Sequence, residues 1–166
     1  MMKQAREHIR ELGEVYTELL GLAREKTEAL KGNDYEKLAA ISEKEQSAID
    51  RAKAVEEARM GTVEAMAEEW GVSAELVTAQ ALIARADAQE SAPLREAVQS
   101  LSQTLHALRA QNEINGRLLG IKMKLASFIL DVSRSDFGDP GNYYNNDGTE
   151  QQKDELTHPR FIDSEI

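Results

Sequence analysis

Residues 94–115 read LREAVQSLSQTLHALRAQNEIN, and one set of positions in this stretch recurs every three or four residues. The set consists of Leu94, Val98, Leu101, Leu105, Leu108, Asn112 and Asn115. Steps of four and three place these side chains along one edge of an α-helix, which is the heptad pattern of helices that pack lengthwise. The stretch therefore predicts a long helix that lies along another helix rather than over a sheet.

The apolar surface of this helix widens after Asn115. The first stripe continues through Leu119, Ala126 and Ile129, and a second stripe runs beside it through Leu118, Ile121, Leu125, Phe128 and Val132. One neighbouring helix cannot cover both stripes, so we expect this part of the helix to bind a partner.

The same periodicity predicts three further helices. Two long ones are expected over residues 3–31 and 35–70, and a shorter one follows Gly71 with Ser73 as its N-cap. The final helix is expected over residues 92–132, and no segment alternates as a strand would. We therefore predict an all-α fold, an elongated antiparallel helical bundle or coiled coil with three long helices and one short one.

The connection between the first two helices is the tripeptide Gly32-Asn33-Asp34. We expect the glycine to adopt the left-handed conformation that ends the first helix, and Asn33 or Asp34 to cap the second. So short a connection returns the chain antiparallel to itself.

The character of the chain changes at Ser133. Residues 133–166 hold eight acidic and three basic side chains and few large apolar ones, which predicts a disordered acidic tail. Two apolar islands interrupt it, Tyr143-Tyr144 and Phe161-Ile162. The predicted domains are thus a helical domain over residues 1–132 and a flexible tail over residues 133–166.

The composition restricts the function classes. The 166 residues include 30 acidic and 20 basic side chains, and the net charge of −10 disfavours nucleic acid as a partner. The absence of cysteine excludes disulfides and thiolate metal sites. The chain starts with charged helix and has no apolar run near the roughly 18 residues of a membrane span, so no membrane insertion is predicted and a cytoplasmic protein is expected.

Catalytic chemistry has little support in the sequence. None of the three histidines, His8, His106 and His158, has a glutamate three residues before it, as a dinuclear metal site in a helical bundle would need. No phosphate-binding glycine loop or nucleophile motif occurs. We expect no enzyme, no metal and no cofactor, and rank an enzyme or metal-binding bundle third among the alternatives. A homodimeric coiled-coil adaptor or scaffold protein ranks second.

Asn112 and Asn115 allow two interpretations. An asparagine in a heptad seam often fixes the register and orientation of the packed helices. Alternatively, both amides lie on an exposed part of the seam and hydrogen-bond a partner. The spacing alone favours the first interpretation, and the second stays open.

Four short motifs in this order resemble the FlgN family of flagellar export chaperones over essentially the whole chain. They are Ala29-Leu30-Lys31-Gly32-Asn33-Asp34 at the first turn; Leu38, Ile41, Glu45 and Gln46 in the second helix; Asn112, Asn115, Gly116, Leu118 and Leu119 in the last helix; and Tyr144, Asp147 and Gly148 in the tail. The ending Phe161–Ile166 resembles only some members of the family, and its role is left open.

The resemblance implies a cytoplasmic chaperone of flagellar type III export. Such proteins bind the C-terminal helices of the hook–filament junction proteins FlgK and FlgL, prevent their premature association and deliver them to the export gate protein FlhA. The client-binding residues implied here are Asn112, Asn115, Leu118, Leu119, Ile121, Lys122, Leu125, Phe128, Ile129 and Val132, and the gate-binding residue is Tyr144. The preferred client stays open, and so does a homodimer in the client-free state.

Overall fold

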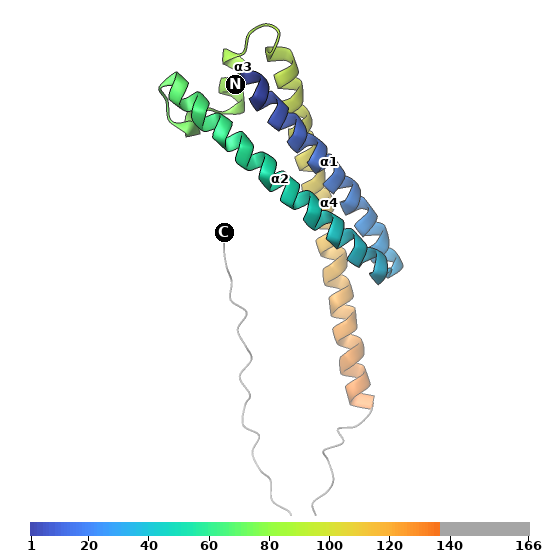
Figure 1. Ribbon diagram of the computed structural model, residues 1–166. Helices are drawn as coiled ribbons and strands as arrows, with labels where there is room; N and C mark the ends of the chain where they lie inside the picture. The colour runs from blue at the N-terminus through green and yellow to red at the C-terminus, as the bar shows by residue number, and fades with distance from the viewer. Residues whose placement is uncertain (137–166) are drawn as a thin grey trace, which may run out of the picture. The chain divides into compact units, whose positions relative to one another are not determined.

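The computed structural model describes the backbone of residues 1–136 and the side chains of residues 1–133 (Figure 1). Its elements are α1 (Met2–Gly32), α2 (Tyr35–Trp70), a 3₁₀ turn η1 (Ala74–Leu76), α3 (Ala79–Arg85) and α4 (Ser91–Asp136). Within this part of the chain there is no strand, so the predicted all-α fold of three long helices and one short one is confirmed. Residues 1–127 form one compact unit, and a second unit begins at Phe128.

α4 extends four residues beyond its predicted end at Val132. The expectation that Ser133 ends the helix was wrong, because residues 133–136 contain neither glycine nor proline, and the first such residues are Gly138 and Pro140. The predicted disorder of the tail and its two apolar islands fall on residues outside those that the structure describes. The domain boundary after Val132 stays a prediction.

The turn between α1 and α2 is built differently from the prediction. Gly32 is the last helical residue, and Asn33 adopts the left-handed conformation, with φ 56° and ψ 34°. The short polar side chain of asparagine tolerates this conformation better than most residues do. Asp34 caps α2 as expected, since its Oδ1 accepts a hydrogen bond of 3.0 Å from the backbone N–H of Lys37.

The region after Gly71 is also more broken than predicted. Ser73 makes no side-chain cap hydrogen bond, and only the short turn η1 follows it. The N-cap of α3 is instead Thr78, whose Oγ1 accepts a hydrogen bond of 3.2 Å from the N–H of Ala81. Arg85 at the end of α3 lies 4.3 Å above the ring of Trp70, which fixes α3 against the end of α2 through a cation–π contact.

Three apolar clusters run along the first unit. The cluster nearest α3 joins α1, α2, α3 and α4 through buried residues such as Ile9, Met66, Leu82 and Leu94. The middle cluster contains Leu12, Val15, Leu19, Ala48 and Ala52, with Leu101 and Leu108 of α4 packed against it. The cluster nearest the α1–α2 turn holds Leu22, Ala29, Ile41 and the half-buried Leu38, all from α1 and α2. The contact of α4 with α2 thus weakens toward the turn.

α4 runs parallel to α1 and keeps a constant register with it. Its polar contacts join Gln111 to Thr27, Asn115 to Thr27 and Lys122 to Asn33, at sequence separations of 84, 88 and 89 residues. A separation that stays nearly constant over these contacts means that both helices advance together. Since α2 is antiparallel to α1, it is also antiparallel to α4 (Figure 1).

Candidate functional site

The heptad seam of α4 divides between two surroundings. Leu94 and Asn115 are buried and Leu108 is half-buried against the middle cluster, whereas Leu105, Asn112 and Leu119 are exposed. The inward positions recur every seven residues at Leu94, Leu101, Leu108 and Asn115, and the exposed positions recur at Leu105, Asn112 and Leu119. Leu105 therefore does not pack inside the bundle, although it belongs to the predicted heptad seam.

Asn115 lies inside the first unit, with 6% of its surface exposed. Its Nδ2 donates a hydrogen bond of 2.8 Å to the carbonyl oxygen of Ala23, and its Oδ1 accepts one of 2.5 Å from the Thr27 hydroxyl. Gln111 donates to the same hydroxyl at 2.6 Å. A buried amide bonded in this way fixes the register of α4 on α1. Of the two interpretations of the seam asparagines, the register-fixing one describes Asn115, whereas Asn112 has the exposed amide of the alternative.

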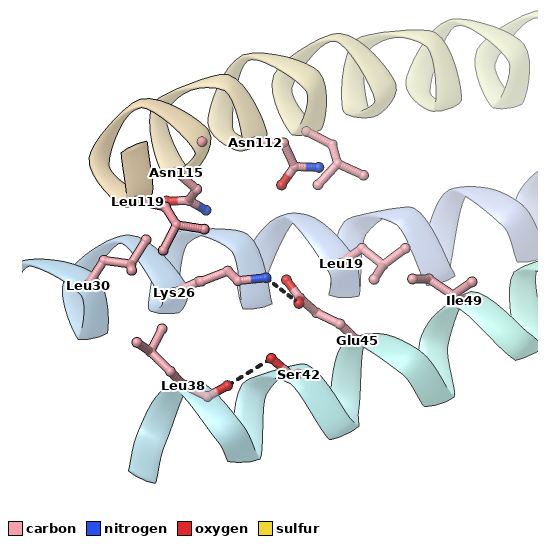
Figure 2. Close-up of a pocket in the computed structure, with 12 residues that line it drawn as sticks. Leu19, Lys26, Leu30, Leu38, Ser42, Glu45, Ile49, Asn112, Asn115 and Leu119 are labelled. Carbon is pink, nitrogen blue, oxygen red and sulfur yellow. Dashed lines mark hydrogen bonds and ion pairs between the residues drawn. The ribbon is translucent and has the colours of Figure 1, made fainter. Parts of the chain in front are cut away.

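An apolar groove of about 610 Å³ opens between α1, α2 and α4 (Figure 2). Its lining includes Leu19, Lys26 and Leu30 of α1; Leu38, Ser42, Glu45 and Ile49 of α2; and Leu108, Asn112, Asn115, Gly116 and Leu119 of α4. Ile49 is 38% exposed and Leu119 is 49% exposed, so both groove walls present large apolar side chains to solvent. We call this site the α1–α2–α4 groove.

One ion pair lies in the groove. Lys26 Nζ is 2.6 Å from Glu45 Oε2, and the two side chains are partly buried (Figure 2). The pair leaves the lining without an uncompensated charge. The surrounding walls are leucine and isoleucine side chains with three small polar groups, the amides of Asn112 and Asn115 and the hydroxyl of Ser42.

The dimensions of the groove match a helix. Its lining spans eleven residue steps on each element, from Leu19 to Leu30, from Leu38 to Ile49 and from Leu108 to Leu119. At 1.5 Å per residue each wall is about 16 Å long, or three helical turns. Two facing helices over the floor of a third leave the position that a fourth helix occupies in a four-helix bundle.

The predicted client-binding residues beyond the groove are mostly exposed. In the first unit, Ile121 and Leu125 are exposed, Leu118 is half-buried, and Lys122 donates a hydrogen bond to Asn33 Oδ1. In the second unit, considered by itself, Phe128, Ile129 and Val132 are exposed. Tyr144 lies outside the described residues.

The sequence did not identify several residues of the groove and of the exposed surface of α4. Met123 and Leu130 of α4 are large, apolar and exposed, and they stand outside both stripes that the sequence suggested. Ile49 and Leu38 form the α2 wall of the groove. Ile49 carried a usable signal, because it is a large apolar residue that falls off the inner stripe of its helix.

The described part of the chain contains no metal-binding cluster and no membrane-spanning helix. Residues 1–136 contain no group of histidine and carboxylate side chains placed to hold a metal ion. None of the helices described is long and apolar enough to cross a membrane. His106 is exposed, whereas His8 is half-buried beside Glu11.

Comparisons with known proteins agree with the sequence resemblance. A family model described as FlgN protein matches residues 1–152. A relative, the uncharacterized protein YvyG of Bacillus subtilis (strain 168), is 34% identical over 126 residues, which is 76% of either chain. No solved structure gives a significant match. The chain belongs to the FlgN family of flagellar export chaperones.

Proposed function

We propose that this protein is a cytoplasmic chaperone that binds the C-terminal helices of FlgK- and FlgL-like hook-associated proteins and delivers them to a FlhA-like export gate. The family relationship supports the chaperone role. The observation that carries the binding mode is the α1–α2–α4 groove, which has the length and the apolar walls for one amphipathic helix.

The client helix occupies the fourth position of the bundle and contacts exposed apolar residues of α4. Leu119 belongs to the α4 wall of the groove. The exposed Ile121 and Leu125 follow on the same helix but on another side of it, where a further segment of the client would contact them. Asn112 offers its amide to polar groups of the client, while Asn115 holds the wall in place from inside. Phe128, Ile129 and Val132 are proposed to extend the contact, and Lys122 and Leu118 to border it.

Burial of these side chains by the client would contribute substantially to the free energy of binding. Full burial of a leucine or isoleucine contributes about 1.5–3 kcal/mol, so three half-exposed residues contribute several kcal/mol in all. Capture of the client in this way requires no nucleotide, no metal and no cofactor. Delivery is assigned to Tyr144, which precedes Asp147-Gly148 at the family spacing.

The test is the binding of a purified C-terminal segment of a FlgK- or FlgL-like protein, measured by calorimetry. We expect a 1:1 complex, and Leu125→Asp or Phe128→Asp should weaken it about 30-fold or more, because a carboxylate would be buried at the interface. Ala54→Asp, on a different surface of α2, is the matched control and should leave affinity unchanged.

Two results would count against the proposal. If no complex forms with either segment, the client assignment is wrong. If both aspartate variants bind like the wild type, the contact lies elsewhere on the chain. A client-free protein that is a stable dimer, and whose size does not change when the segment is added, would favour the coiled-coil adaptor instead.

A further inference from the structure

A second heptad seam runs along α4 within the first unit. Its members are Ile114, Leu118, Ile121 and Leu125, which follow one another by steps of four, three and four residues, the spacing of heptad positions d, a, d and a. Leu118 is half-buried and the other three side chains are exposed. We call these four residues the Ile114–Leu125 seam.

A helix that lies in the α1–α2–α4 groove cannot cover this seam. Each residue of an α-helix advances by about 100° around the helix axis, so Leu118 and Leu125 point about 100° and 120° away from Leu119 of the groove wall. A helix with its side chains is only about 10–12 Å across. A client helix in the groove therefore leaves the Ile114–Leu125 seam exposed, and a separate helix is needed to cover it.

The charges beside the seam are all positive. Residues 114–127 contain three cations and no acid, a net charge of +3 in a chain whose total is −10. In the heptads of the seam, Arg117 and Lys124 occupy position g and Lys122 occupies position e. These positions flank the apolar contact of a coiled coil and decide which partner it accepts. All three cations therefore border any helix that packs on the seam.

Two of these cations form no ion pair in the described part of the chain. The ion pairs among residues 1–133 all take their cation from α1 or α2. Lys122 donates a hydrogen bond to Asn33 Oδ1, which ties it to the α1–α2 turn. Arg117 and Lys124 are exposed, and their charges are available to the carboxylates of a partner.

We propose that the Ile114–Leu125 seam binds an acidic amphipathic helix. Such a helix carries leucine or isoleucine at its own a and d positions, and glutamate or aspartate at the positions that face Arg117 and Lys124. The inference rests on the proposed chaperone function and specifies the client further. The client presents two helical segments, one for the groove, whose own charges are already paired, and an acidic one for the seam.

Other occupants fit the charges less well. In a dimer built on this seam, Arg117 would meet a lysine or an arginine of the second copy in either orientation of the two helices. An anionic membrane surface would face more of the protein than one seam, and the chain outside residues 114–127 is strongly acidic. A single helix contacts the seam without meeting that charge.

Two designed peptides test the charge preference. Both consist of four heptads with isoleucine at a and leucine at d, and they differ only at e and g, where one carries glutamate and the other lysine. Calorimetry with the full chain should show the glutamate peptide binding at least about 10-fold more tightly. The acidic chain as a whole attracts the lysine peptide, so a preference for glutamate requires a local basic surface. The preference should shrink in 1 M NaCl.

Charge reversal beside the seam should reverse the preference. The double variant Arg117→Glu and Lys124→Glu should bind the lysine peptide more tightly than the glutamate peptide. The matched control is Arg95→Glu with Arg109→Glu, which reverses two exposed cations of the same helix at position f, on the side opposite the seam. This control should bind the two peptides with the wild-type preference.

An apolar variant identifies where the glutamate peptide binds. Ile121→Asp should weaken its binding about 30-fold or more, because a carboxylate would be buried in the contact. Ile49→Asp, in the α2 wall of the groove, should leave it unchanged. If Ile49→Asp weakens binding and Ile121→Asp does not, the peptide occupies the groove and the proposal is wrong.

Three further results would overturn the proposal. The first is equal affinity for the two peptides, or no binding of either. The second is binding of phosphatidylserine vesicles in place of the glutamate peptide, which identifies a membrane as the partner. The third is a dimer of the free protein that Ile121→Asp dissociates. The assay contains no hook-associated client, so its failure leaves the chaperone function standing, and a failed client-binding experiment leaves the peptide preference to be measured separately.

Discussion

Thr27 of α1 and Asn115 of α4 lie 88 residues apart in the sequence and are hydrogen-bonded to each other in the interior of the bundle, at 2.5 Å. The contact joins the floor of the α1–α2–α4 groove to its α4 wall. The hydrogen bond therefore fixes the position of the α4 wall relative to α1.

Asn115→Ala should destabilise the protein by about 1–3 kcal/mol, because it leaves the Ala23 carbonyl and the Thr27 hydroxyl without this partner in a buried place. Chemical denaturation in urea measures the change. Asn112→Ala is the control, since Asn112 is exposed and should change stability by less than about 0.5 kcal/mol. Equal losses in the two variants would show that burial of Asn115 is not what stabilises the register.

The α1–α2 turn distinguishes Gly32 from Asn33. Gly32→Ala should stabilise the protein by about 0.5–1 kcal/mol, because Gly32 is helical and a Cβ there meets nothing within 4 Å. Asn33→Val should cost about 1–2 kcal/mol, because valine is poorly accommodated at a φ of 56°. Thermal unfolding of both variants is the measurement, and a loss of stability in Gly32→Ala would contradict the observed cap.

Ile49→Asp tests whether the α2 wall belongs to the client site. Ile49 is exposed, so we expect stability to change by less than about 0.5 kcal/mol. Affinity for a FlgK- or FlgL-like C-terminal segment should fall at least about 10-fold, since a carboxylate would then be covered in an apolar wall. Calorimetry measures the affinity, with Ala54→Asp as the reference variant. An unchanged affinity would show that the client contacts α4 and not the α2 wall.

Tyr144→Ala should separate binding from delivery. Tyr144 is not among the residues proposed to bind the client, so client affinity should stay within about two-fold of the wild-type value. Secretion of the hook-associated client into the medium should drop in cells that carry the variant. Tyr143→Ala is the neighbouring control; normal secretion with Tyr144→Ala would remove this tyrosine from the gate-binding role.

Local signals predicted the elements well. Gly71 ends α2, Asp34 caps it and the heptads of α4 predict a long helix, because each of these features depends on residues within a few positions of one another. The errors are also local in origin. Ser73 and Gly32 are favourable residues for a cap and a left-handed turn, but Thr78 and Asn33 take these roles because the neighbouring helices fix where the chain must bend.

The sequence could not predict the groove, for a different reason. A heptad pattern shows which positions of α4 share an edge, but it does not show which neighbour that edge meets. Leu108 packs against the middle cluster and Asn115 is hydrogen-bonded to α1, while Asn112 and Leu119, one helical turn away from each, are exposed in the groove. The α2 wall depends in addition on how far α4 stands from α2, a quantity that no spacing within either helix contains.

The Lys26–Glu45 pair bears on how tightly any occupant is held. Its two ions already satisfy each other at 2.6 Å while some of their surface still contacts water. An apolar helix laid over them removes that water and offers no polar group in return, which costs free energy. The pair should therefore shorten the residence time of a purely apolar helix in the groove. It should favour helices that carry a hydroxyl or an amide at the middle turn. A chaperone has to release its client, so fast dissociation is as necessary as binding.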